Sequence, residues 1–118
     1  MTIILYGIPN CDTVRKARGW LGDKGLYYVF HDYKKAGIGE DTLRGWVSAR
    51  GWETMLNHKG PTFRKLPEEA RADLDAAKAV RLMAEHTSAI KRPVVEYPGG
   101  LLVGFDQAEW SKALAGGR

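Results

Sequence analysis

The sequence predicts an α/β protein in which a four-stranded mixed sheet is interrupted by a helical segment. An apolar run, a helical pattern and a second apolar run follow one another in residues 3–33. This order is typical of a βαβ unit, whose two strands are parallel. Two further apolar runs flank Pro98-Gly99-Gly100 and predict an antiparallel hairpin. Residues 38–88 show helical spacing without a strand pattern, so we expect a helical insertion within a single domain of residues 1–118.

The first strand and the first helix meet at the only cysteine of the chain. Residues 3–6 form an apolar run that predicts a buried strand, and Gly7-Ile8-Pro9-Asn10 supplies the turn residues that would end it. A helical pattern begins near Cys11, and its apolar positions fall on one face, namely Val14, Ala17, Leu21 and Trp20. Cys11 is therefore predicted to lie at or near the N-terminus of a helix.

This position favours reactive chemistry at Cys11. Unpaired backbone N–H groups and the positive end of the helix dipole stabilise an anion there, so a thiol pKa of about 8.5 could fall to roughly 3.5–7.5. Arg15, one turn further along, could add a positive charge on the same side. The alternative is that Cys11 is a small buried hydrophobic residue, as single cysteines commonly are. Its place on a strand-to-helix turn favours the reactive interpretation.

The second strand is expected over residues 26–33, which are rich in aromatic and β-branched side chains. His31 and Asp32 would lie where this strand leaves the sheet. His31 could be catalytic, although a solvated histidine is the commoner state at such a place. The glycines of residues 34–39 predict a loop, and Glu40 or Asp41 could begin the next helix.

The remaining elements follow from helix-start and hairpin signals. Pro67 followed by two glutamates predicts a helix that begins at Glu68 and continues to His86. Pro93 stands at the first position of the third strand, one of the few places where a strand tolerates proline. Asp106 can cap a last helix, and residues 116–118 are expected to fray.

Composition narrows the functional classes. The chain has 118 residues, 44% hydrophobic and 27% charged, which fits one ordered globular domain. Its net charge of +4 is spread along the chain, so small anionic partners are better supported than nucleic acid. No apolar run approaches the length of a membrane span, and no signal peptide is visible. The single cysteine fits a reducing compartment, so we expect a cytoplasmic protein. We also expect a monomer with no metal site.

The order of elements, with a cysteine after strand one and a proline opening strand three, resembles a thioredoxin-like fold. Three stretches make the resemblance more specific: Tyr6-Gly7-Ile8-Pro9-Asn10-Cys11-Asp12-Thr13 with Lys16-Ala17, Asn57–Leu66, and Ile90–Glu96. Together they resemble the arsenate reductase (ArsC-type) family over essentially the whole chain. The opening motif is most similar to the glutathione-dependent, thiol-reductase-like branch of that family, which is related to Spx-type regulators.

The resemblance implies roles for particular residues. Cys11 corresponds to the nucleophile, Arg92 to an anion-binding arginine, and Pro93 to a cis-proline that presents Arg92 beside the thiolate. The remaining residues expected to contact the substrate are Asn10, Asp12, Thr13, Arg15 and Lys59. Lys59 is the only counterpart of a middle arginine, and no arginine stands at residues 103–105 where the family has another. Lysine cannot form the bidentate fork of arginine, so these departures point away from arsenate itself.

Two functions are compatible with these residues. In the first, the Cys11 thiolate attacks a small anionic or disulfide substrate, and glutathione or a glutaredoxin-type partner resolves the covalent intermediate. Because the chain has no second cysteine, turnover needs an external thiol, and glutathione would be a co-substrate without any bound cofactor. The alternative is a non-enzymatic, Spx-like regulator that binds RNA polymerase. Such regulators carry a Cys-X-X-Cys switch, whereas Val14 stands at the second cysteine position here.

Overall fold

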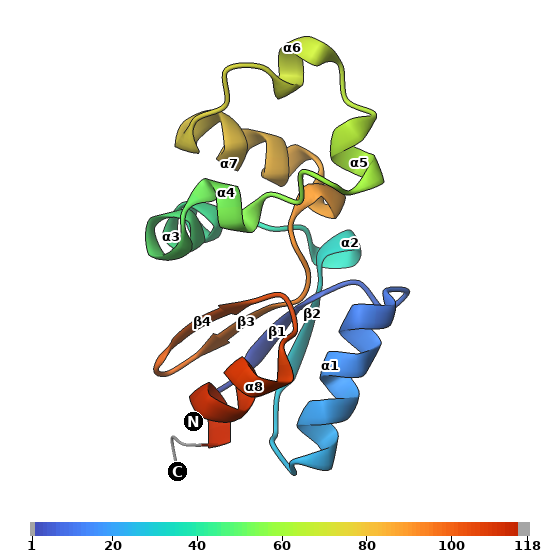
Figure 1. Ribbon diagram of the computed structural model, residues 1–118, viewed down its shortest axis with the longest axis vertical. Helices are drawn as coiled ribbons and strands as arrows, with labels where there is room; N and C mark the ends of the chain where they lie inside the picture. Colours follow the sequence, from blue (N-terminus) through green and yellow to red (C-terminus); the bar gives the residue numbers. More distant parts are fainter. Residues whose placement is uncertain (1, 116–118) are drawn as a thin grey trace. The chain divides into compact units, whose positions relative to one another are not determined.

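A computed structural model describes residues 2–115 of the chain (Figure 1). These residues form two compact units. One contains the chain up to Asp32 together with the segment from Arg92 onward, and the other contains Tyr33–Lys91. The helical segment expected over 38–88 lies inside the second unit. That the whole chain is a single domain stays a prediction. Residues 116–118, for which a frayed end is expected, lie outside the described residues.

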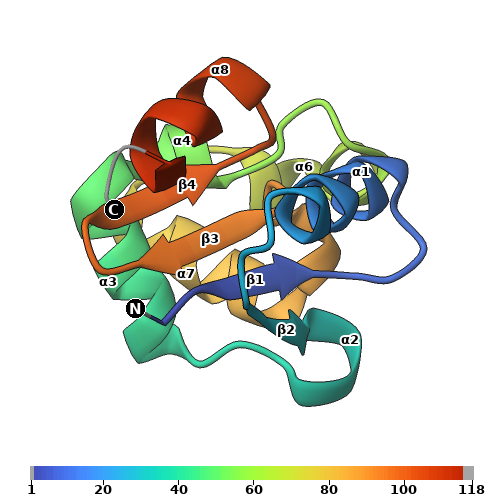
Figure 2. The ribbon, with the colours of Figure 1, turned by 90° about the horizontal axis from the view of Figure 1, so that it is seen from below.

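The first unit is built on a four-stranded mixed sheet with the strand order β2-β1-β3-β4 (Figure 2). Its strands are β1 (Ile4–Gly7), β2 (Val29–Asp32), β3 (Val94–Tyr97) and β4 (Gly100–Val103). β1 pairs in parallel with β2 and antiparallel with β3, and β3 and β4 form the antiparallel hairpin. The predicted mixed sheet is confirmed.

Two helical segments pack on one face of this sheet (Figure 2). They are α1 (Asp12–Asp23) and α8 (Gln107–Trp110), which continues into the π-helical turn η2 (Ser111–Ala115). Trp110 lies at their centre, fully buried, with its ring 5.8 Å from Trp20 and 4.8 Å from Phe105. Its indole Nε1–H donates a hydrogen bond of 3.0 Å to the Gly104 carbonyl, so its one polar atom is satisfied. Asp106 caps α8 as predicted, because its carboxylate accepts the Glu109 N–H at 3.1 Å.

The second unit is helical. It contains α2 (Tyr33–Ala36), α3 (Glu40–Arg50), α4 (Trp52–Met55), α5 (Pro61–Arg64), α6 (Glu68–Arg71), α7 (Ala76–Glu85) and the 3₁₀ turn η1 (Thr87–Ala89). The two longest of these helices, α3 and α7, pack against each other. An isolated antiparallel bridge joins Leu56 to Ile90 and ties the end of α4 to the segment after η1.

The second strand is shorter than the aromatic run predicts. β2 begins at Val29, and Tyr27 is 80% exposed. The residues before it close α1, because the Leu26 N–H bonds back to the Leu21 carbonyl around Gly25, whose φ is +66°. At the other end, the chain enters α2 at Tyr33, inside the predicted strand and ahead of the predicted loop.

The helix expected over residues 68–86 is interrupted, so that prediction is wrong. α6 ends at Arg71, and α7 begins only at Ala76. Asp73 has a φ of +51°, a left-handed conformation that ends a helix, and the Asp75 carboxylate accepts the Lys78 N–H at 2.8 Å as a new N-cap. Local capping by aspartate therefore overrides a helical spacing that is continuous in the sequence. None of the described helices has the length and hydropathy needed to cross a bilayer.

Candidate active site

Cys11 lies at the junction between β1 and α1. It is the N-cap residue of α1, with an extended backbone (φ −111°, ψ 125°), and the helix begins at Asp12. Gly7 permits this junction, because a Cβ at Gly7 would lie 2.8 Å from Cγ2 of the buried Val14. The close approach of strand end and helix start therefore fixes where the cysteine lies.

Backbone donors of the first helical turn face the sulfur of Cys11. The N–H groups of Val14 and Thr13 both hydrogen-bond to this thiol. Neither group has an intrahelical partner, because the first carbonyl that the helix uses, that of Cys11, accepts the Arg15 N–H at 2.9 Å. The thiol therefore occupies the anion-binding position of the helix terminus.

Arg92 reaches the same sulfur from the start of β3, although it is far from Cys11 in the sequence. The Arg92–Pro93 peptide bond is cis, as expected. Pro93 is buried and its carbonyl accepts the Gly104 N–H at 2.8 Å, which attaches this segment to the end of the hairpin. Pairing of β3 beside β1 then brings the Arg92 side chain to Cys11, to which it hydrogen-bonds.

These contacts change the acidity of the thiol. Partial burial raises the pKa of Cys11, but the hydrogen bonds from Val14 N–H and the Arg92 side chain, the positive charge of Arg92 and the Thr13 N–H all lower it. The lowering effects prevail, so the pKa of Cys11 lies below the usual value of a free cysteine. Because the side chain is also partly exposed, the thiolate has the features of a reactive nucleophile.

Arg15 is engaged by its own loop. Its guanidinium pairs with the Asp12 carboxylate and donates a hydrogen bond of 3.4 Å to the Pro9 carbonyl. Both charged side chains are largely exposed, at 58% and 83%. Arg15 therefore clamps the turn before Cys11 and offsets the negative charge of Asp12, while the direct positive contact to the sulfur comes from Arg92.

The other predicted site residues are placed as follows. Asn10 is exposed on the turn before Cys11, and Thr13 is exposed as a side chain but contributes its N–H to the sulfur. Lys59 belongs to the second unit, where it lines a polar cavity with Lys91. No group of three potential metal ligands occurs among residues 2–115.

A polar contact between β1 and β3 was missed by the sequence analysis. The Tyr6 hydroxyl donates a 2.7 Å hydrogen bond to Glu96, and the Tyr6 ring lies 4.8 Å from that of His31. Burial, followed by the hydrogen bond to Glu96 and its negative charge, raises the pKa of Tyr6 well above its usual value. Each strand could be recognised in the sequence, but the sequence does not show how the two strands are aligned. In the observed register Glu96 pairs with Ile4, and this makes Tyr6 and Glu96 diagonal neighbours.

Comparison with known proteins places this chain in a family. The sequence matches the ArsC family over residues 6–113. The chain belongs to the ArsC family. Its described structure superimposes on the YffB (PA3664) protein with a TM-score of 0.93 and 52% identity, covering 95% of this chain and 98% of that one. An arsenate reductase (ArsC) related protein from Brucella melitensis gives a TM-score of 0.76 and 50% identity, over 98% and 95% of the two chains.

The same family membership accounts for the fold, which is thioredoxin-like. A more distant relative is the global transcriptional regulator Spx of Streptococcus mutans, which is 24% identical over 91% of this chain and 79% of its own length. The suspected relationship to ArsC proteins and to Spx is thus confirmed.

Proposed function

We propose that this ArsC-family protein is a thiol-dependent reductase with Cys11 as its nucleophile. One observation carries the proposal: a single, partly exposed cysteine receives two helix N-terminal N–H groups and the side chain of Arg92, which together lower its pKa. This is how catalytic cysteines are activated. The Brucella melitensis relative, described as arsenate-reductase-related, supports a reductase of this kind.

The proposed reaction consists of three thiol–disulfide exchanges. The Cys11 thiolate attacks one sulfur of a disulfide substrate, forming a mixed disulfide and releasing the other sulfur as a thiolate. One external thiolate, from glutathione or a glutaredoxin-type protein, then attacks the Cys11 sulfur of this mixed disulfide, which releases the second half of the substrate as a thiolate. A second external thiolate attacks the external sulfur now bound to Cys11 and restores the Cys11 thiolate. The two external thiols leave as one disulfide, and the substrate is reduced to two thiols by the same two electrons. An external thiol is required because the sequence contains one cysteine.

Anionic substrates fit this site best. Arg92 brings a fixed positive charge to the sulfur, and it would neutralise both the thiolate and a negative group on the incoming substrate. Arsenate fits less well, because the chain offers Lys59 where the family has one arginine and has none at residues 103–105. We therefore favour a small anionic disulfide, in the reducing environment of the cytoplasm, over arsenate.

The test is to measure the mass of the protein after incubation with oxidised glutathione. We expect one glutathione per chain on Cys11, released by added reduced glutathione, and a slower reaction in Arg92→Ala. Cys11→Ser is the control and should form no adduct. A Cys11 that resists both oxidised glutathione and iodoacetamide at neutral pH would refute the proposal.

A second candidate is a regulator of the Spx type, which the 24% identity to Spx of Streptococcus mutans supports. The Val14 side chain is fully buried where a Cys-X-X-Cys switch would have its second cysteine, so any such regulator would lack that redox switch. Co-purification of the chain with RNA polymerase would favour this candidate. Thiol-transfer activity without polymerase binding would dismiss it.

A further inference from the structure

A polar cavity in the helical unit is not used by any of the exchange steps proposed above. Its volume is about 270 Å³, and its polar lining consists of Glu53, Thr54, Asn57, His58, Lys59 and Lys91. These residues come from α4, from the turn after it and from the end of the unit. They meet because the Lys91 N–H bonds to the Met55 carbonyl and the Asn57 N–H to the Ala89 carbonyl, both at 2.8 Å.

The charged side chains that line the cavity form no ion pairs with one another. Lys59 and Lys91 are exposed, and neither forms an ion pair with any residue in the described part of the chain. Glu53, on the preceding helix, likewise has no cationic partner among the described residues. Two positive groups and one negative group thus line one hollow, each available to a ligand. Isolated surface charges would carry no such meaning, but these share a cavity.

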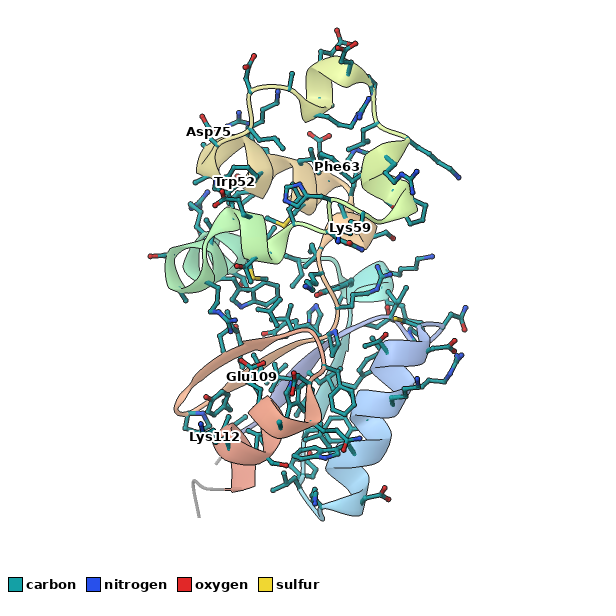
Figure 3. The ribbon with its side chains drawn as sticks, in the orientation of Figure 1. Trp52, Lys59, Phe63, Asp75, Glu109 and Lys112 are labelled. Carbon is teal, nitrogen blue, oxygen red and sulfur yellow. The ribbon has the colours of Figure 1, made fainter. Side chains whose placement is uncertain are left out.

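The wall beside Lys59 is held in place by packing. The His58 ring lies between two aromatic rings, 5.9 Å from Trp52 and 5.5 Å from Phe63. Figure 3 shows Trp52, Lys59 and Phe63 on neighbouring segments of the helical unit. The Gly60 N–H closes the turn on the Asn57 carbonyl at 3.3 Å. A Cβ at Gly60 would lie only 2.5 Å from the Asn57 amide nitrogen, so glycine is what lets this amide pack over the turn.

We propose that this cavity binds a free α-amino-acid group, with the carboxylate between Lys59 and Lys91 and the ammonium at Glu53. An α-amino-acid group carries both charges within a few bonds, and the cavity offers two cations and one carboxylate for them. Asn57 and His58 supply further hydrogen-bonding groups at the same wall. A volume of 270 Å³ suits one end of a small peptide or a single amino acid.

Two sources present this group, a γ-glutamyl thiol such as glutathione and a free amino acid such as glutamate. If the ligand is glutathione, the inference rests on the proposed function, because that function requires an external thiol. If the ligand is a free amino acid, it does not. The γ-glutamyl end of glutathione keeps its α-carboxylate and α-ammonium free. Binding at this cavity would therefore be a recognition step for the thiol co-substrate that is separate from its sulfur chemistry.

The experiment measures binding without any disulfide exchange. The full chain carrying Cys11→Ser is titrated by calorimetry with S-methylglutathione, with glutamate and with inorganic phosphate, a plain anion. Lys59→Gln and Lys91→Gln should each weaken S-methylglutathione about three- to tenfold, the range for charged contacts at a partly exposed site. Glu53→Gln should weaken S-methylglutathione and glutamate but strengthen phosphate. Lys35→Gln, an exposed cation on α2 that does not line the cavity, is the matched control and should change nothing.

The outcomes separate this inference from the proposed function. Tighter binding of S-methylglutathione than of glutamate, with the same dependence on the lysines, supports the γ-glutamyl source, and equal binding supports the free amino acid. The inference is overturned if neither compound binds, if the lysine variants bind as well as wild type, or if Glu53→Gln affects all three probes alike. If Cys11 still forms a glutathione adduct in that case, the proposed function stands. Conversely, cavity-dependent binding with an inert Cys11 supports the inference and refutes the reductase.

Discussion

Replacing Arg92 by glutamine should lower the reactivity of Cys11 by reducing the thiolate population. The substitution removes a positive charge and a charged hydrogen bond to the sulfur, and it leaves the N–H groups of Val14 and Thr13 in place. A hydrogen bond to a charged group contributes about 1.5–3 kcal/mol when it is well buried. Because Cys11 is partly exposed, solvent screening reduces this to about 1.4 kcal/mol, which corresponds to a factor of about ten in the ionisation equilibrium.

The assay is the rate of alkylation by iodoacetamide as a function of pH, since only the thiolate reacts. Arg92→Gln should react about tenfold more slowly than wild type at pH values below both midpoints, and its midpoint should move to higher pH. At high pH the two rates should converge. Lys16→Gln is the control, because it removes an equal charge from α1, the helix that begins beside Cys11. The Lys16 side chain is exposed and has no ion pair among the described residues, so the alkylation rate of this variant should stay within about twofold of wild type. Equal midpoints in Arg92→Gln and wild type would refute the role of Arg92.

The lowered pKa also predicts how stability depends on pH. An acid whose pKa is lower in the folded state stabilises the fold while it is ionised. The contribution of Cys11 is therefore complete above about pH 8.5, the pKa of a cysteine in the unfolded chain, and is lost as the pH falls through the lowered pKa of the folded state. The difference in unfolding free energy between wild type and Cys11→Ser, measured by urea denaturation, should accordingly grow with pH across this interval and then level off.

Substitutions at Val14, Tyr6 and Arg15 test the surroundings of the site. Val14→Pro removes the N–H that faces the sulfur and should slow alkylation at low pH. Val14→Ala keeps this N–H, so it should reduce the free energy of unfolding by about 2 kcal/mol and leave the alkylation midpoint unchanged. Tyr6→Phe, followed by thermal unfolding, should cost about 1 kcal/mol through loss of the hydrogen bond to Glu96. Arg15→Gln should leave the negative charge of Asp12 unneutralised and slow alkylation by about twofold. Adding Asp12→Asn to the same chain should restore the rate. If Arg15 acted directly on the sulfur, the double variant would stay slow.

The parts of this structure that were predictable from the sequence are those set by local chemistry. An apolar run followed by turn residues and a helical face placed Cys11 at a helix N-terminus, where it is indeed the N-cap. The glycine-rich turn after Tyr97 marked the hairpin, and Asp106 marked the last helix. Each of these signals lies within a few residues of the feature that it predicts, so no knowledge of the tertiary fold was needed.

Features that depend on long-range register or on competing local bonds were not predictable. Tyr6 and Glu96 become partners only once β1 and β3 pair in one particular register. The break between α6 and α7 arises because Asp75 caps a new helix, although the spacing of apolar residues continues across it. The cavity at Lys59 needs Lys91, which an isolated bridge between Leu56 and Ile90 brings there from the far end of the unit.

Val14 shows why a motif position can be filled by a residue that does no chemistry with its side chain. The side chain of Val14 is fully buried over Gly7, while its backbone N–H hydrogen-bonds to the sulfur of Cys11. Any residue except proline supplies that N–H, so activation of the thiol places no demand on the side chain at this position. A cysteine there would add an internal resolving thiol, and valine adds apolar packing instead. The same backbone site can therefore serve an internally switched protein or, as we propose here, one whose thiolate is activated within the chain and resolved from outside it.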